Sequence, residues 1–210
     1  MHIIRHPHCA WYVYPACAAI CVRWQGRVAA CHGGGFQLGG RCPPVIKTKR
    51  VIAMQEIIGT SNRVLEVDLS TKQSSIYEVT DRELRLYLGG KGLGLKLLYD
   101  RMEPGIDPLG EENMIAFMMG VLMGTGAPCS GRFAAVTKSP LTGIMVAASC
   151  GGPFGMALKT SGWDGLIVRG KSSEPVYLSV DSKGAEFKSA KGIWGKDTHA
   201  AQEIMLGEGS

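Results

Sequence analysis

Acidic residues are missing from the first quarter of the chain. Residues 1–55 contain seven arginines and lysines but no aspartate or glutamate, so this head carries a charge of +7. The whole chain of 210 residues carries +5, which leaves −2 for the part from Glu56 onward. Because the basic character belongs to the head, the charge does not point to a nucleic-acid partner for the remainder, and we expect none.

Paired cysteines and histidines are also scarce. Five of the seven cysteines precede residue 56, no C-x-x-C pair occurs, and the spacing matches no regular disulfide framework. Cys17 and Cys21 could combine with the histidines of the head into a metal site, but the paired ligands of zinc sites are normally closer together in sequence. After residue 32 the only histidine is His199, which gives a Ser-His or Cys-His catalytic system little support. We therefore predict no catalytic side chain and no metal ligand; a cofactor would have to carry any chemistry.

Long apolar runs are absent as well. Residues 11–22 are apolar but too few to cross a bilayer, and no clean small-residue cleavage site follows them. We predict no membrane association. Met54 is a plausible start of the protein, in which case residues 1–55 are upstream sequence; otherwise they form a basic, cysteine-containing head.

From Glu56 onward, apolar stretches between turn residues predict short strands with a few helices. Thr80 and Glu83 form a capping box, which predicts a helix, and Gly89-Gly90 separates it from a second helix that ends near Arg101. Strand patterns occur at 63–69, 76–79, 114–119, 133–137, 144–148, 166–168 and 176–180, and further helix signals at 153–162 and 197–206. Because strands and helices do not alternate regularly, we predict one α+β domain over residues 56–210, β-rich with mixed sheets.

One segment matches a phosphate-binding formula. Gly165 to Ser172 fits G-x-x-x-x-G-K-S, a loop that needs a helix opening at its lysine. Here the middle residues have a strand pattern, and Pro175 with another strand follows. We favour a strand–turn–strand, with a phosphate-binding module as an alternative.

Three glycine-rich segments are candidate ligand contacts. Residues 89–94 separate two predicted helices, residues 124–132 combine small residues and hydroxyls with the single cation Arg132, and residues 149–153 end a strand and open a helix. An arginine can fork onto a phosphate, and backbone N–H groups at a helix start attract anions. Each segment by itself is also typical of a turn, and Cys150 is more readily a small buried thiol than a ligand.

Taken in order, these segments resemble the aldehyde ferredoxin oxidoreductase family over about residues 60–206. The resemblance rests on RVLEVDLS (63–70), YLGGKGLG (87–94), PGIDPL (104–109), GTGAP (124–128), GRF (131–133), TKSPLTG (137–143), GWDG (162–165), GK (170–171), PVY (175–177) and WGKD (194–197). It implies the amino-terminal domain of such an enzyme, a β-rich base that cradles a tungsten- or molybdenum-bis-pterin cofactor.

The same resemblance implies the reaction and its partners. Family members oxidise an aldehyde to a carboxylic acid with oxygen from water, and electrons leave through a [4Fe-4S] cluster to ferredoxin. The cluster ligands belong to C-terminal domains that this chain lacks, so we expect the fragment to be inactive alone. A cytoplasmic location and a homodimer are further expectations. The substrate stays open between aldehydes and related oxo compounds.

The resemblance also assigns residues of the site. Arg132 is similar to the family's pterin-phosphate arginine, and Lys91 stands beside Gly92 where relatives often carry arginine. A turn whose backbone approaches the pterin is matched by Ser149, Cys150, Gly151 and Gly152. Because the family commonly has asparagine where this chain has Ser149, one amide partner is lost. That departure supports an alternative, a non-catalytic domain that keeps the fold without the cofactor.

Overall fold

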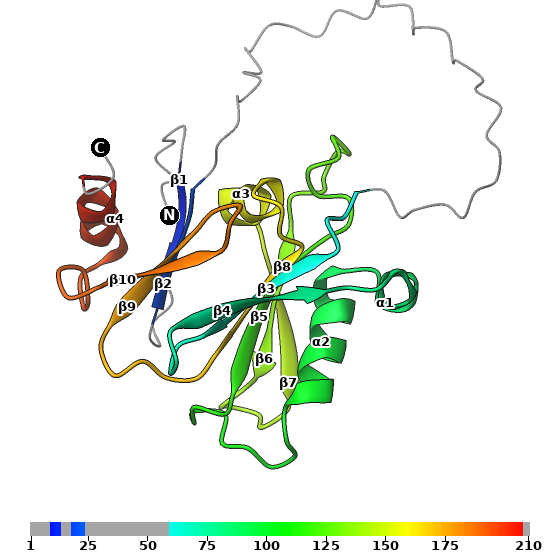
Figure 1. Ribbon diagram of the computed structural model, residues 1–210, viewed down its shortest axis with the longest axis horizontal. Coiled ribbons are helices and arrows are strands. Elements are labelled where there is room, and N and C mark those ends of the chain that lie inside the picture. The colour runs from blue at the N-terminus through cyan, green and yellow to red at the C-terminus, as the bar shows by residue number, and fades with distance from the viewer. Residues whose placement is uncertain (1–8, 14–17, 24–58, 208–210) are drawn as a thin grey trace, which may run out of the picture.

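The computed structural model describes residues 9–13, 18–23 and 59–207, and it describes side chains from Gly59 to Met205. Within these ranges the strands form two sheets, accompanied by short helices (Figure 1). The predicted α+β class with mixed sheets is confirmed.

The larger sheet has six strands in the order β4-β3-β8-β5-β6-β7. The β3 and β8 strands pair in parallel, and every other neighbouring pair is antiparallel. The strands are β3 (Arg63–Asp68), β4 (Gln73–Glu78), β5 (Met114–Met119), β6 (Phe133–Lys138), β7 (Met145–Cys150) and β8 (Gly165–Arg169). All six were predicted, with shifted ends for the two edge strands β4 and β7.

The smaller sheet has four strands in the order β1-β2-β9-β10. They are β1 (Cys9–Val13), β2 (Ala18–Arg23), β9 (Val176–Val180) and β10 (Ala185–Ser189), with β2 parallel to β9. Only β9 was predicted. The sequence prediction missed β10 because its charged Glu186 and Lys188 are exposed and its inward residues are only half-buried, which leaves little apolar alternation.

The first helix begins where its capping signal places it. The first, α1 (Asp81–Tyr87), has the full capping box: Thr80 accepts from the Glu83 backbone, and the Glu83 carboxylate accepts from the Thr80 backbone. The others are α2 (Gly90–Arg101), α3 (Pro153–Thr160) and α4 (Thr198–Gly207). None of the helices in the described ranges is long and apolar enough to cross a bilayer.

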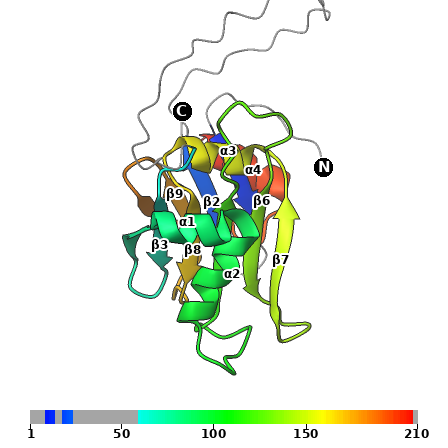
Figure 2. The ribbon, with the colours of Figure 1, turned by 90° about the vertical axis from the view of Figure 1, so that its right-hand side faces the viewer.

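One face of the six-stranded sheet is covered by α2, as the two perpendicular views show (Figures 1 and 2). Leu93, Leu97 and Leu98 of α2 are buried there against alternate residues of the strands. Those strand residues are Val64, Ala116, Met118, Ala134, Val136 and Ile167. The alternation of apolar side chains along each strand therefore supplies a core on this face.

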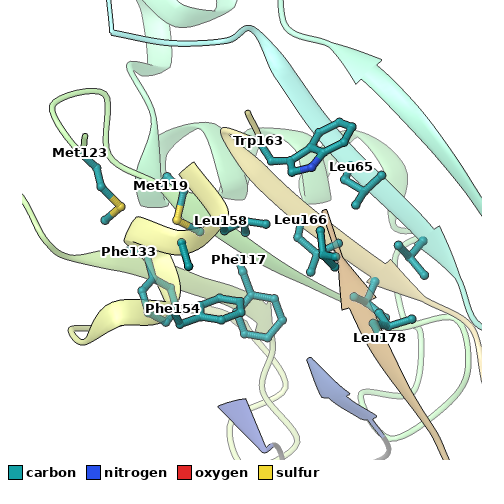
Figure 3. Packing of buried hydrophobic residues seen from close by; sticks show 14 of the residues in the cluster. Leu65, Phe117, Met119, Met123, Phe133, Phe154, Leu158, Trp163, Leu166 and Leu178 are labelled. Carbon is teal, nitrogen blue, oxygen red and sulfur yellow. The ribbon is translucent and has the colours of Figure 1, made fainter. Parts of the chain in front are cut away.

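The opposite face packs against α3 and β9. Phe117, Phe133 and Phe154 form the centre of this second core, with ring centroids 5.2 to 6.4 Å apart (Figure 3). Leu158 of α3 and Leu178 of β9 join them with no exposed surface. Because both faces of the central strands are buried, the six-stranded sheet is the middle layer of the molecule.

Candidate functional site

Glycine-rich loops gather at one end of the six-stranded sheet. The register pairs Met119 at the end of β5 with Phe133 at the start of β6, and Phe133 with Cys150 at the end of β7. The loop of residues 120–132 and the turn at residues 151–152 therefore leave the sheet at the same end. Arg132 directly precedes Phe133, so the structure brings it close to the predicted turn.

The start of α2 lies at this same end. A Cβ atom at Gly89 would come within 3.0 Å of the Met119 carbonyl oxygen and 3.3 Å of Val121. Glycine suits this close approach, so the start of α2 lies beside the beginning of the 120–132 loop. Gly92 has a different explanation, since a Cβ atom there would lie 2.5 Å from the Tyr87 carbonyl oxygen. The structure therefore accounts for Gly92 by the tight corner between α1 and α2.

The 120–132 loop is shaped by its own side chains. Met123 is buried in the core and anchors it. The Thr125 hydroxyl donates to the Leu122 carbonyl at 2.6 Å, and the Ser130 hydroxyl donates to the Ala127 carbonyl at 2.8 Å. Cys129 is exposed and takes a left-handed backbone conformation with φ of 59°. These contacts hold a loop of small residues above the sheet end.

Several glycines at the site face open space. A Cβ atom at Gly126, Gly131, Gly151 or Gly152 would meet no atom within 4 Å. Gly126 and Gly152 have positive φ angles, which explains the choice of glycine there. Gly131 and Gly151 have neither a positive φ nor a close neighbour. A ligand that approaches the backbone closely is a physical reason for glycine at such positions.

The electrostatics of this end favour an anion. The α2 and α3 helices begin after Gly89 and Gly152, neither start has a side-chain cap, and neither first turn contains an acidic residue. The positive dipole end of each helix is therefore not offset by a carboxylate. Lys91 and Arg132 are both exposed there. Two cations and two uncapped helix starts form a surface suited to phosphate groups.

Ser149 and Cys150 lie on opposite faces of β7. Ser149 is exposed and pairs with Ala134, which belongs to the core beneath α2. Cys150 is half-buried and packs against the other core. The structure thus places Ser149 on the α2 face, and it favours a packing role for the Cys150 thiol.

Residues 165–172, which match the phosphate-binding formula, do not form a phosphate-binding loop. Gly165 to Arg169 form the buried strand β8, and the Lys171 N–H donates to the Ser70 hydroxyl at 3.0 Å. This turn lies at the other end of the sheet and leads into β9. The strand–turn–strand prediction is confirmed. In the part of the chain with described side chains, no group of three or more His, Cys, Asp or Glu could hold a metal ion.

Sequence reasoning missed Lys159 and Asp164, which meet as a buried ion pair behind the 120–132 loop. The available signal was Asp164 itself, a carboxylate directly before an apolar strand. Buried carboxylates need partners, but the sequence does not show which cation reaches them.

Comparisons with known proteins find relatives for most of this chain. The family model described as "Aldehyde ferredoxin oxidoreductase, N-terminal domain" matches residues 64–210. The tungsten-containing aldehyde ferredoxin oxidoreductase of Thermococcus kodakarensis is 41% identical over 152 residues, which cover 71% of this chain and 25% of that protein. The aliphatic sulfonate oxidoreductase, WOR-like subunit, of Pyrococcus furiosus is 33% identical over 151 residues, covering 70% of this chain and 24% of that protein.

A solved structure has the same fold. The active-site complex BamBC of benzoyl coenzyme A reductase, in complex with 1,5-dienoyl-CoA, aligns with a TM-score of 0.69 and 37% identity. The alignment covers 71% of this chain and 23% of that one. The chain thus spans about a quarter of the length of the relatives it matches. It belongs to the aldehyde ferredoxin oxidoreductase family and carries that family's N-terminal domain.

Proposed function

We propose that residues 56–210 form the part of a family oxidoreductase that holds a tungsten- or molybdenum-bis-pterin cofactor. The observation that carries the proposal is the end of the six-stranded sheet where open glycines lie between two uncapped helix starts. Gly131 and Gly151 leave space that neither backbone conformation nor packing explains. Lys91 and Arg132 add exposed positive charge. A large ligand with phosphate groups fits this surface in shape and in charge.

The residues at this end of the sheet have the chemistry to contact the phosphates and the pterin ring of such a cofactor. Arg132 has the planar guanidinium that binds a phosphate with two parallel hydrogen bonds, and Lys91 contributes a point charge. The positive dipole end of α3 would attract a second anionic oxygen. Ser149 offers one hydroxyl to the pterin edge. The bound metal would supply the oxidation chemistry, and this chain would orient the cofactor.

The activity of the whole enzyme follows from the family. We propose oxidation of an aldehyde or a related oxo compound, with ferredoxin or another iron-sulfur protein as electron acceptor. The [4Fe-4S] ligands and the substrate channel would come from further domains. A homodimer and a cytoplasmic location complete the proposal. The names of the relatives support this breadth of substrates, since they act on aldehydes, sulfonates and a coenzyme A thioester.

Titration of the chain with inorganic pyrophosphate tests the binding surface directly. We expect the amide NMR signals of residues 120–132 and 151–154, apart from the prolines Pro128 and Pro153, to shift, because pyrophosphate mimics the cofactor's phosphates. Arg132→Ala should weaken binding about tenfold, the loss of about 1.4 kcal/mol of charge-assisted hydrogen bonding.

Lys171→Ala is the matched control. Lys171 is also an exposed cation, but it lies at the other end of the sheet in the phosphate-loop formula. Its variant should bind pyrophosphate like the wild type. If Lys171→Ala abolishes pyrophosphate binding while Arg132→Ala retains it, the alternative of a phosphate-binding module at residues 165–172 is favoured.

A further inference from the structure

A buried ion pair lies directly behind the proposed cofactor surface. The side chains of Lys159 in α3 and Asp164 before β8 are only 8% and 5% exposed, and their charged groups are in direct contact. Burying two charges costs several kcal/mol per ion, so such a pair is weak evidence for stability. Its position relative to the site indicates a different role.

Asp164 joins three segments of the chain. Its Oδ2 accepts from the Ser61 backbone N–H at 2.8 Å and from the Ser61 hydroxyl at 3.1 Å. Its own N–H donates to the Arg63 carbonyl at 2.8 Å, and its carbonyl accepts from the Met119 N–H at 2.9 Å. Through Lys159 it also holds the last turn of α3. The carboxylate therefore joins the segment before β3 to α3, while the backbone of Asp164 pairs with the start of β3 and the end of β5.

Two of these segments touch the 120–132 loop. A Cβ atom at Gly124 would lie 3.5 Å from Cγ of Lys159, so the loop backbone lies against the lysine stem. A Cβ atom at Gly59, just before Ser61, would lie 2.9 Å from the Val121 carbonyl oxygen and 3.1 Å from Thr125. The loop is thus packed between the lysine and the segment that Asp164 holds.

We propose that Lys159 and Asp164 are positioning residues that hold the 120–132 loop in the position that phosphate binding requires. The proposal rests on the proposed function of the same surface. Neither residue touches the ligand. Both act through Gly124 and the segment at Gly59, which set where the loop's backbone and Arg132 lie.

The test uses the full chain and the double variant Lys159→Met/Asp164→Asn. Both charges are removed together, so neither is left buried without its partner. Methionine keeps an unbranched apolar stem near Gly124, and asparagine keeps an oxygen that can accept from Ser61. We expect the dissociation constant for inorganic pyrophosphate to rise about tenfold, because a displaced loop misplaces its donors. Amides of residues 120–132 should also exchange hydrogen about tenfold faster.

Leu98→Ala separates positioning from general destabilisation. Leu98 of α2 is fully buried against the six-stranded sheet, and its truncation creates a cavity on the face opposite Lys159 and α3. This variant should melt earlier yet keep the pyrophosphate affinity and the loop exchange of the wild type. If the double variant fails to fold, Lys159→Gln/Asp164→Asn replaces it, because two neutral amides can hydrogen-bond to each other and no charge is left buried without its partner.

Two failures can be told apart. Wild-type affinity and wild-type loop exchange in the double variant overturn the positioning role. If the wild-type chain itself does not bind pyrophosphate, the proposed function is contradicted, and the exchange of the loop amides alone then decides whether the ion pair holds the loop.

Discussion

At the scale of single residues, the glycines of this chain separate into two groups. At Gly89, Gly92 and Gly155 a Cβ atom would come within about 3 Å of a neighbour, so packing explains the residue. At Gly131 and Gly151 no structural need for glycine exists. Gly131 and Gly151 lie at the proposed phosphate surface. Replacing one of them is therefore expected to change ligand binding without lowering the stability of the fold.

Gly131→Ala should leave folding intact and impair binding. Its φ is compatible with alanine and its Cβ would meet open space, so we expect unfolding free energy to be unchanged or raised by about 0.4–1 kcal/mol. The added methyl group would obstruct a ligand on the backbone, so pyrophosphate affinity should fall. Calorimetry measures both quantities.

Gly192→Ala is the control for this substitution. Gly192 also has open space around its Cβ position and no positive φ, but it lies in the turn before α4. Its variant should gain the same stability and bind normally. Equal binding by the Gly131 and Gly192 variants would remove the argument that open glycines mark the site.

At the scale of elements, Tyr77 connects β4 to α1. Its hydroxyl donates to Glu83 Oε1 at 2.6 Å, and Glu83 is the acidic member of the capping box. This hydrogen bond, followed by burial and the charge of Glu83, raises the pKa of Tyr77 from 10.0 to about 12. Burial raises the pKa of Glu83, but the hydrogen bonds from Tyr77 and Thr80 outweigh it and the net pKa is lowered. A sheet edge and a helix start thus share one carboxylate.

Tyr77→Phe should change how stability depends on pH. Because the folded pKa is raised, the neutral phenol contributes its full stability below pH 10 and loses it as pH rises toward 12. At pH 8 the variant should be less stable by about 1 kcal/mol. Urea unfolding at pH 8, 10 and 11 should show this difference shrinking with pH. A difference that stays constant across that range would contradict the link to Tyr77 ionisation.

At the scale of the whole molecule, the proposed phosphate surface lies at one end of the domain's middle layer. The six-stranded sheet is held between α2 on one face and α3 with β9 on the other, so its strands cannot shift independently (Figures 1 and 2). The loops at its end are carried by this rigid support. The matched region makes up 25% of the Thermococcus kodakarensis relative, which makes a whole-protein test necessary.

A chimera supplies that test. Residues 64–210 of this chain would replace the matching quarter of the Thermococcus kodakarensis relative, to which they are 41% identical over the aligned region. We expect the purified chimera to contain tungsten and to oxidise an aldehyde with ferredoxin as acceptor. Arg132→Ala in the chimera should lower the metal content. A folded chimera without tungsten would favour the alternative of a domain that keeps the fold without the cofactor.

The amino-acid sequence by itself determined the local elements of this protein. Alternation at residues 63–69 and short apolar stretches between turn residues predicted the six strands of the larger sheet, and the Thr80–Glu83 capping box predicted α1, because these signals involve residues close in sequence. The ordered motifs also indicated the family. Edge strand β10 lacked such a signal because charged residues occupy its exposed positions.

Only the tertiary structure decided which distant residues meet. The register across β5, β6 and β7 brings Arg132, Ser149 and the start of α3 to one end of the sheet. It also assigns Gly92 and Cys150 to packing, and it pairs Lys159 with Asp164. Strand order and register arise from long-range packing of both sheet faces, and no local pattern in the sequence encodes which strands become neighbours.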